Sequence, residues 1–172
     1  MSDVTDVTDV TVRPARPDDV VAVHRLVVAL AAYEREPDAV DVGPDDLASA
    51  LFGDQPAVRC HVAEVPGTDG RPVVVGTAVW FVSFSTWRGR HGIWLEDLVV
   101  EESHRGSGVG RRLLAELARE CVRRGWTRLE WAVLDWNTPA HGFYRATGAA
   151  PQEDWTTWRL DGPRLGRLAA DA

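Results

Sequence analysis

The amino-acid sequence predicts one mixed α/β domain, and three features of its 172 residues support this fold class. Apolar residues make up 45% of the chain and charged residues 26%, which is typical of a protein that folds around a single core. Segments with helical apolar spacing occur among continuous apolar runs bounded by turn residues, and no linker separates them. This pattern favours a central mixed β-sheet flanked by helices.

The first third of the chain contains one predicted strand and two predicted helices. Residues 1–9 repeat Asp-Val-Thr and are expected to be a disordered acidic tail, which leaves 10–172 for the folded domain. A short strand is predicted at 10–13. Apolar residues at helical spacing predict a helix over 20–32, and a Gly-Pro-Asp-Asp sequence begins a shorter helix over 43–51.

After the second helix, the period of the apolar residues changes to that of strands. The runs 58–65 and 73–84 predict two strands, and the turn residues of 66–70 between them predict a hairpin. A loop is expected over 85–92. The apolar run 93–100 then predicts a third strand, buried within the sheet.

The C-terminal part is expected to continue the alternation of helices and strands. An amphipathic helix over 108–124 ends at Gly125, and a strand is predicted over 127–134. A short helix over 138–147 and a final strand over 155–160 follow. The expected order of elements is therefore β-α-α-β-β-β-α-β-α-β.

Composition and charge exclude several classes of partner. The formal net charge of −7 argues against nucleic acid and is compatible with a cationic ligand. No apolar run approaches the roughly 20 residues that span a bilayer, so no membrane contact is expected. Cys60 and Cys121 are expected to be small buried residues in the reducing cytoplasm. The five histidines show no metal-ligand spacing, and no metal is predicted.

A glycine-rich segment lies between a predicted strand and the long amphipathic helix. Its sequence is Arg105-Gly106-Ser107-Gly108-Val109-Gly110-Arg111, which lets the backbone approach a ligand at a helix start, where phosphate binds well. The segment matches neither a nucleotide P-loop nor the Gly-x-Gly-x-x-Gly dinucleotide fingerprint. It fits a pyrophosphate cradle for coenzyme A. A helix-start turn without a ligand is the alternative.

Two adjacent carboxylates, Glu96 and Asp97, interrupt a strongly apolar predicted strand. Alternation along the strand predicts that their side chains face opposite sides of the sheet. Burying a carboxylate without partners is costly, so each is expected to have a partner or a role. At least one is predicted to be functional. The alternative is one structural acid beside one that is close to solvent.

Asn137 and Tyr144 are conspicuous because the chain contains one Asn and two Tyr residues in all. They lie seven residues apart on one predicted strand-loop-helix segment, which favours a functional role for both. The ordinary alternative is that the Asn caps a helix and that the Tyr packs with its hydroxyl group at the rim of the core.

Taken together, the motifs resemble the diamine (spermidine/spermine) acetyltransferase family within the GNAT superfamily of acyl-CoA N-acyltransferases. The likeness covers residues 11–160 and includes the glycine loop. The other motifs that carry it are Arg13-Pro14-Ala15, Ala32-Tyr33-Glu34, His61-Val62-Ala63-Glu64-Val65, Ser85-Thr86-Trp87, Leu95-Glu96-Asp97 and Ala132-Val133-Leu134-Asp135-Trp136-Asn137.

Within that family, the sequence resembles the thialysine branch more than the polyamine branch. The polyamine branch has an acidic residue two positions before the loop tryptophan Trp87, and this chain has Ser85 there. The stretch from Trp87 to Glu96 is also one residue longer than in the polyamine branch. The expected substrate is therefore a small cationic diamine or a lysine-like amino acid, with spermidine or spermine as the alternative.

The resemblance implies a role for each site residue. Glu96 would anchor the amine and accept its proton through water, and Tyr144 would protonate the departing thiolate of coenzyme A. Residues implied to bind acetyl-CoA are Leu98, Val99, Val100, Arg105, Gly106, Ser107, Gly108, Val109, Gly110, Arg111, Asn137, Thr138, Pro139, Ala140 and Tyr144. Residues implied to line the amine site are Tyr33, Glu34, Trp87, Glu96, Glu130 and Trp131.

The family likeness also implies a homodimer, with residues 153–155 near the partner's site. Two further functions stay open at this point. One is a protein N-acetyltransferase, and the other is a non-catalytic module that binds acyl-CoA. The presence of Glu96, Asn137 and Tyr144 together argues against the second, because a binding module has no need of catalytic groups.

Overall fold

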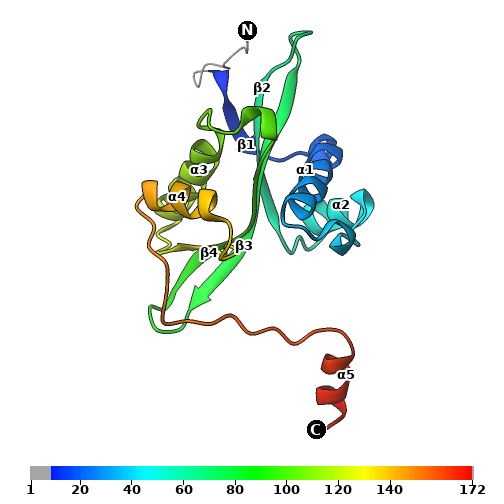
Figure 1. The fold of residues 1–172 in the computed structure, drawn as a ribbon, viewed down its shortest axis with the longest axis vertical. Coiled ribbons are helices and arrows are strands. Elements are labelled where there is room, and N and C mark those ends of the chain that lie inside the picture. The colour runs from blue at the N-terminus through cyan, green and yellow to red at the C-terminus, as the bar shows by residue number, and fades with distance from the viewer. Residues whose placement is uncertain (1–8, 172) are drawn as a thin grey trace. The chain divides into compact units, whose positions relative to one another are not determined.

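A computed structural model describes residues 9–171 of the chain (Figure 1). The tail predicted over residues 1–9 lies outside the described residues, except for Asp9. The chain divides into two compact units, Met1–Ala132 and Val133–Ala172. The first unit holds the β-sheet and three α-helices, and the second holds two further α-helices.

The sheet of the first unit has five strands in the order β1-β2-β3-β4-β5. Neighbouring strands are antiparallel from β1 to β4, whereas β5 pairs parallel to β4, so the predicted mixed sheet is confirmed. The strands are β1 (Thr11–Pro14), β2 (Arg59–Pro66), β3 (Pro72–Ser85), β4 (Arg90–Val100) and β5 (Leu129–Glu130).

Helices cover both faces of this sheet, as the sequence predicts (Figure 1). Helices α1 (Val20–Tyr33) and α2 (Pro44–Phe52) lie on one face, and α3 (Val109–Arg124) lies on the other. The short 3-10 turns Pro17–Asp19, Pro37–Ala39 and Glu102–His104 connect these elements. The core on the α1 face consists of Val20, Val23, Leu26, Leu47, Leu51, Cys60, Val62, Val74, Val79 and Val99.

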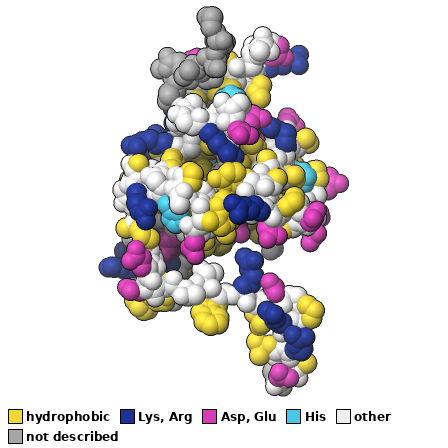
Figure 2. Space-filling model, viewed as in Figure 1, with side chains coloured by type: hydrophobic (Ala, Val, Ile, Leu, Met, Phe, Trp, Pro, Cys, Tyr) yellow, Lys and Arg dark blue, Asp and Glu magenta, His cyan; other side chains and the backbone are white. Residues whose placement is uncertain are grey.

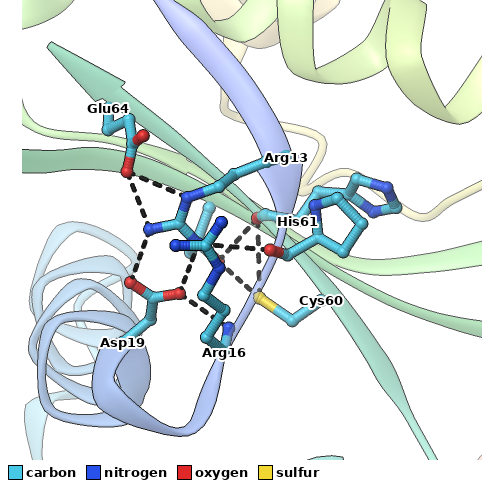
Figure 3. Close-up of polar contacts among 8 residues, drawn as sticks. Arg13, Arg16, Asp19, Cys60, His61 and Glu64 are labelled. Carbon is cyan, nitrogen blue, oxygen red and sulfur yellow. Dashed lines mark hydrogen bonds and ion pairs between the residues drawn. The ribbon is translucent and has the colours of Figure 1, made fainter.

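An ion-pair network joins β1 to the start of α1 and to β2 (Figure 3). The guanidinium of Arg13 donates to both carboxylate oxygens of Asp19 at 2.7 and 3.0 Å, and to Glu64 Oε2 at 2.7 and 3.0 Å. Burial alone raises the pKa of Asp19, but bonds from Arg13 and from the Arg16 N–H hold that pKa below its usual value. The two carboxylates accept the hydrogen bonds of the half-buried guanidinium, and these bonds fix where α1 begins.

Most predicted elements of the first unit form close to their expected limits. Helix α3 ends at Gly125, whose φ of 66° places it in the left-handed region, and this confirms the predicted stop. Strand β4 begins earlier than expected, at Arg90, so the connection from β3 is a tight turn rather than a loop over 85–92. The reason is that residues 90–92 pair directly with residues 83–85 of β3.

The strand predicted over 127–134 is largely wrong, because only Leu129 and Glu130 pair with β4. Their partners on β4 are Ile93 and Trp94, and β4 becomes irregular just beyond them. A strand forms only beside another strand whose backbone N–H and C=O groups are free to pair. An apolar run alone therefore does not produce a strand.

The second unit contains α4 (Thr138–Ala146) and α5 (Pro163–Ala170). The final strand predicted over 155–160 is wrong, since these residues form neither helix nor strand. Helix α5 was not expected; Pro163 at its first position is the start signal in the sequence. Among residues 9–171, no helix is long and apolar enough to cross a membrane.

Candidate active site

A β-bulge at Glu96 shapes the middle of β4. Asp97 pairs with Val79 and Leu95 pairs with Trp80, so Glu96 is an extra residue with no partner of its own in β3. Glu96 is exposed, and its Oε2 accepts a 3.0 Å hydrogen bond from the indole N–H of Trp94. The bulge interrupts the strict alternation that the sequence predicts for Glu96 and Asp97.

Three carboxylates come together where α1 ends over β4. Asp97 pairs across the sheet with Val79, a core residue on the α1 face, so its side chain points to that face. Burial, together with the smaller effects of the negative charges of Glu96 and Glu34, raises the pKa of Asp97 to about 6. Burial also raises the pKa of Glu34, which follows the last residue of α1. The result is a concentration of negative charge on the α1 face.

Aromatic side chains lie beside these carboxylates. Phe81 and Trp94 are directly paired residues of β3 and β4, and their ring centroids are 6.4 Å apart. Phe81 is two residues beyond Val79, so it shares the face of Asp97. Sequence reasoning did not select Phe81, Trp94 or Asp97 as site residues. The alternation of β3 could have indicated Phe81, but only the bulge brings Trp94 to Glu96.

The glycine loop has the geometry expected of a phosphate cradle. Gly106 and Gly108 have φ angles of 77° and 87°, in the left-handed region that favours glycine. Among the described residues beyond Gly106 and its two neighbours, no atom lies within 4 Å of the position that a Cβ at Gly106 would occupy, so this side of the loop is open. Within residues 9–171, no side chain caps the start of α3, which leaves the first-turn N–H groups available to an anion. These features fit the pyrophosphate of acetyl-CoA.

Two arginine contacts tie α1 to the segment that follows β4, one at the glycine loop and one at Glu101. The Arg105 guanidinium carbon lies 4.7 Å from the centroid of the Tyr33 ring, and Arg105 Nε donates to the Val100 carbonyl at 3.2 Å. Arg25 Nη1 forms a 2.7 Å ion pair with Glu101 Oε1. The structure therefore brings Tyr33, predicted for the amine site, into contact with Arg105, predicted for the cofactor site.

The other cofactor residues predicted in the first unit divide between core and surface. Val99 and Val109 are buried in the core, so their backbone groups alone could meet a ligand. Leu98, Val100, Ser107 and Gly110 are half-buried, and Arg111 is exposed on the first turn of α3. The Ser107 hydroxyl donates to the His104 carbonyl at 2.6 Å, which shapes the loop itself.

The remaining amine-site predictions lie in the turn between β3 and β4 and at β5, where Glu130 pairs with Trp94 of β4. Trp87 is exposed in the turn between β3 and β4, and Ser85 is buried at the start of that turn, where its hydroxyl accepts from the Arg88 N–H at 3.3 Å. Glu130 forms a 2.7 Å ion pair with Arg128. Trp131 is half-buried beyond the end of β5.

The second unit holds the predicted residues of α4. Asn137 is buried and caps α4, since its side-chain oxygen accepts from the Ala140 N–H at 3.3 Å; the structural alternative for this residue is therefore confirmed. Thr138 and Pro139 are exposed on the first turn, and Ala140 is half-buried. Tyr144 is half-buried, with its ring centroid 5.1 Å from that of Phe143.

A cleft of about 440 Å³ opens near the C-terminal end of α3. It is lined by Phe84, Gly89, Arg90, His91, Arg124, Gly125 and Trp126. Its charged walls are arginines, so it does not suit an ammonium group. Among the described residues, no group of three or more His, Cys, Asp or Glu side chains could hold a metal ion, and the thiols of Cys60 and Cys121 are free and buried.

Comparison with known proteins supports an acetyltransferase fold and reaction. Residues 21–149 match the model of the Acetyltransferase (GNAT) family. The chain is 37% identical over 164 residues to a thialysine N-epsilon-acetyltransferase of Bos taurus, covering 92% of this chain and 96% of that protein. It is 27% identical over 194 residues to an L-ornithine N5-acetyltransferase of Arabidopsis thaliana, covering 90% and 85%.

Solved structures agree with this assignment. An integron cassette protein from the mobile metagenome of V. cholerae superposes with a TM-score of 0.76 at 25% identity, covering 94% of this chain and 98% of that one. The family resemblance stated from the motifs is thereby confirmed. The chain belongs to the GNAT acetyltransferase family and is an acetyl-CoA-dependent N-acetyltransferase.

Proposed function

We propose that this enzyme acetylates a primary amine of a small, cationic, lysine-like amino acid. The observation that carries the proposal is the cluster of Glu34, Glu96 and Asp97 beside the aromatic pair Phe81 and Trp94. Carboxylates offer an ammonium group a charge partner, and aromatic faces attract cations within about 6 Å of the ring centroid. The glycine loop on the same unit would hold the acetyl donor.

Two further observations favour a thialysine-type substrate over a polyamine. Relatives of similar length are named for thialysine and ornithine, which are short amino acids with one side-chain amine. Ser85 shares the face of Phe81 and, at about 3.3 Å per residue, lies about 13 Å farther along β3. A long polyamine would need an acidic group at this distance, and Ser85 supplies none.

The proposed cofactor site combines the end of β4 with the glycine loop. The backbone of Leu98 to Val100 would hold the pantetheine arm, and an N–H there would polarise the thioester carbonyl. Gly106 to Arg111 would surround the pyrophosphate. The family resemblance implies that Asn137 to Ala140 also bind the acetyl donor, and Asn137 would act through the helix start that it caps.

The chemistry requires one proton to leave the amine and one to reach the thiolate. An alkylammonium has a pKa of about 10, so it is mostly protonated and not nucleophilic at neutral pH. Glu96 would hold the ammonium and accept its proton through water, after which the amine nitrogen forms a bond to the thioester carbon. Tyr144 would donate the proton of its phenol hydroxyl to the sulfur as the carbon–sulfur bond breaks.

We also propose that the enzyme works as a homodimer in which the C-terminal segment meets the second copy. Large apolar side chains of this segment are exposed, as the hydrophobic atoms on it in Figure 2 illustrate. These residues are Trp155, Trp158, Leu160, Leu165 and Leu168. An apolar surface of this kind favours burial against a partner. Light scattering would give twice the mass of 18.9 kDa, and a monomer at working concentration would contradict this part of the proposal.

A steady-state screen with acetyl-CoA tests the function. The amines are thialysine, lysine, ornithine, putrescine, spermidine and 2,4-diaminobutyrate, and the readout is release of free coenzyme A. We expect the highest kcat/KM for thialysine or another amino acid of the panel. A preference for spermidine would overturn the substrate assignment, and no release with any amine of the panel would overturn the assignment of a small cationic amine as the substrate.

Two variants test the proposed roles of the catalytic groups. Tyr144→Phe should lower kcat by about ten-fold or more while acetyl-CoA affinity stays near wild type. Glu96→Gln should mainly impair use of the amine. Unchanged turnover in the first variant removes Tyr144 as the acid, and unchanged amine kinetics in the second remove Glu96 as the anchor.

A further inference from the structure

The cleft at the C-terminal end of α3 lies apart from both proposed ligand sites. Helix α3 has 16 residues, so the cleft lies about 24 Å along the helix from the glycine loop that precedes it. Phe84 and His91 line the cleft as directly paired residues of β3 and β4. Each is three residues from Phe81 or Trp94 on its own strand, so both side chains point to the opposite face of the sheet from that aromatic pair.

The charged groups that line this cleft are positive, although the chain as a whole has a formal net charge of −7. They are the guanidinium groups of Arg90 and Arg124, and the lining residues of the described part include no carboxylate. Arg90 is exposed, and its Nη1 makes a 3.5 Å contact with the Gly89 carbonyl. Within residues 9–171, Arg90 has no carboxylate at ion-pair distance, so its charge can meet a ligand.

Two contacts fix the orientation of Arg124. Its Nε forms an ion pair with the buried carboxylate of Glu120, and its guanidinium carbon lies 5.0 Å from the centroid of the Trp126 ring. Glu120 also pairs with Arg123, so one carboxylate faces two guanidinium groups and one positive charge remains. Among the described residues, neither Nη group of Arg124 has a hydrogen-bond partner. A fixed guanidinium with two such donors suits the oxygens of a phosphate or a carboxylate.

Three rings form the remaining wall of the cleft. The centroids of Phe84 and His91 are 5.1 Å apart, and those of His91 and Trp126 are 6.0 Å apart. The rings are inclined to each other by 62° and 53°, so they do not cover one another's faces. Phe84 and His91 are exposed, and Trp126 is half-buried. A planar ring in the cleft can therefore pack against aromatic surface beside the guanidinium groups.

The backbone of the cleft is open to a ligand at two glycines. Gly89 and Gly125 have φ angles of 60° and 66°, in the left-handed region that favours glycine. Among the described residues other than their chain neighbours, no atom lies within 4 Å of the position that a Cβ at either glycine would occupy. The two segments that meet at the cleft thus leave room for a bound molecule.

The end of α3 opposes an anion only weakly. A helix C-terminus carries about half of a negative elementary charge, which is less than the charge of either lining guanidinium. Its last carbonyls are also occupied, because the Gly125 N–H donates to Val122 O at 3.2 Å and the Trp126 N–H donates to Cys121 O at 2.8 Å. The balance of charge at the cleft is therefore positive.

We propose that this cleft is a second binding site, and that its ligand is a small anion with a planar ring that bears a phosphate or carboxylate group. The anionic group would contact Arg90 and Arg124, and the ring would pack against Phe84, His91 and Trp126. The volume of about 440 Å³ lies in the range of small-molecule sites, which is roughly 300–1,000 Å³. The charge of this ligand is opposite to that of the amine, so the two sites select different molecules.

Calorimetry with phenyl phosphate tests the site on the full-length enzyme. The enzyme is first loaded with one equivalent of coenzyme A, which occupies the glycine loop. We expect one phenyl phosphate to bind per chain with a Kd of about 1 mM or lower. Inorganic phosphate, which lacks the ring, should bind about ten-fold more weakly. Benzoate in place of phenyl phosphate shows whether a carboxylate or a phosphate is the preferred group.

Variants of the lining residues locate the binding. Arg90→Gln and Arg124→Gln should each weaken phenyl phosphate binding by about ten-fold, the loss typical of a charge-assisted contact. Phe84→Ala should bring the affinity for phenyl phosphate close to that for inorganic phosphate. Melting temperatures near that of the wild type establish that the variants are folded. If Arg124→Gln unfolds because Glu120 loses a partner, Arg90→Gln still tests the site, since Arg90 has no ion pair among the described residues.

Arg123→Gln is the matched control. Arg123 also pairs with Glu120 but does not line the cleft. Its affinity for phenyl phosphate should stay within about two-fold of the wild type, because charges outside the cleft are screened at physiological salt. An equal loss in Arg123→Gln would show a diffuse charge effect and overturn the site.

Three other results would also overturn the proposal. They are no binding of either phenyl phosphate or benzoate, binding that is unchanged in the lining variants, and equal affinity for phenyl phosphate and inorganic phosphate. Acetyl transfer should continue at the wild-type rate in Arg90→Gln. The failure of this second site would therefore leave the proposed reaction standing.

Discussion

The indole N–H of Trp80 donates a 3.0 Å hydrogen bond to Nδ1 of His61. Both side chains are buried, and their rings stack with centroids 6.0 Å apart. Because Nδ1 is the acceptor, the neutral ring carries its proton on Nε2. Burial lowers the pKa of His61, while Glu116 raises it and Arg123 lowers it. This pair therefore requires an uncharged imidazole in the folded protein.

We predict that His61 makes the fold sensitive to acid. The folded-state pKa of His61 lies below its unfolded value, so its contribution is complete above about pH 6.5 and is lost as the pH falls through the folded-state pKa. In His61→Asn, the amide oxygen can replace Nδ1 as the acceptor and does not titrate. The melting temperature of the wild type should fall more between pH 7.5 and 5 than that of the variant.

His91→Asn is the control for this experiment, because His91 is exposed. Its melting temperature should follow the wild type at each pH. Equal acid sensitivity of His61→Asn and the wild type would show that the buried imidazole does not limit stability.

We predict that ionised Asp97 lowers the stability of the fold and that its charge contributes to the site. Its pKa of about 6 lies above the ordinary 3.8, so the cost of its charge builds up between those two pH values and is complete above pH 6. At 1.36 kcal/mol per unit, Asp97→Asn should gain up to about 2 to 3 kcal/mol at pH 7.5 and much less at pH 4. Urea unfolding at both pH values measures the difference.

The same substitution should harm function. If Asp97 adds to the negative charge that attracts the amine, Asp97→Asn raises the KM for thialysine and leaves the KM for acetyl-CoA near wild type. Asp54→Asn, at an exposed position after α2, should change neither stability nor kinetics. A gain in stability that is equal at both pH values would rule out the charge as its cause.

Arg35 holds the end of α1 in a strained conformation, with a φ of 68°. The Glu36 N–H donates to Ala31 O at 2.9 Å and the Arg35 N–H to Ala32 O at 3.2 Å, the two bonds of a Schellman cap. Such a cap favours glycine, so Arg35→Gly should be more stable than Arg35→Ala by about 1 kcal/mol. Comparing Gly with Ala cancels the loss of the arginine side chain.

Ala32 provides the opposite case on the same helix. Its backbone is helical, so Ala32→Gly should lose roughly 0.5–1 kcal/mol. In urea unfolding, glycine should therefore be more stable than alanine at position 35 and less stable than alanine at position 32. The same sign at both positions would contradict the assignment of strain to Arg35.

Ser85→Asp tests why this site would favour a short amine. The new carboxylate would lie on the face of Phe81, where a polyamine could reach it with a distal amine. We expect the ratio of kcat/KM for spermidine to that for thialysine to rise by about ten-fold, typical of one added charge pair. Ser85→Asn, which has a similar shape and no charge, should leave the ratio unchanged. An unchanged ratio in Ser85→Asp would mean that the substrate does not lie near Ser85.

Local patterns predicted the elements that carry their own signals. The spacing of apolar residues in α1 and α3 fixes which face each helix buries, and Gly125 marks a helix end by its backbone alone. The glycine loop was predictable for the same reason, because the residues that adopt the left-handed backbone conformation, Gly106 and Gly108, are glycines in the sequence. By contrast, the apolar segment 155–160 has strand character but no strand to pair with.

The sequence by itself determined the fold class, the family and the position of the phosphate loop, because these depend on local backbone preference and on motifs. Tertiary structure alone decided how the site is assembled. The bulge at Glu96 arises from the register between β3 and β4, and the stacking of Arg105 on Tyr33 joins residues 72 positions apart. The pKa of Asp97 depends on burial and on Glu34 from another element, and no single segment contains that information.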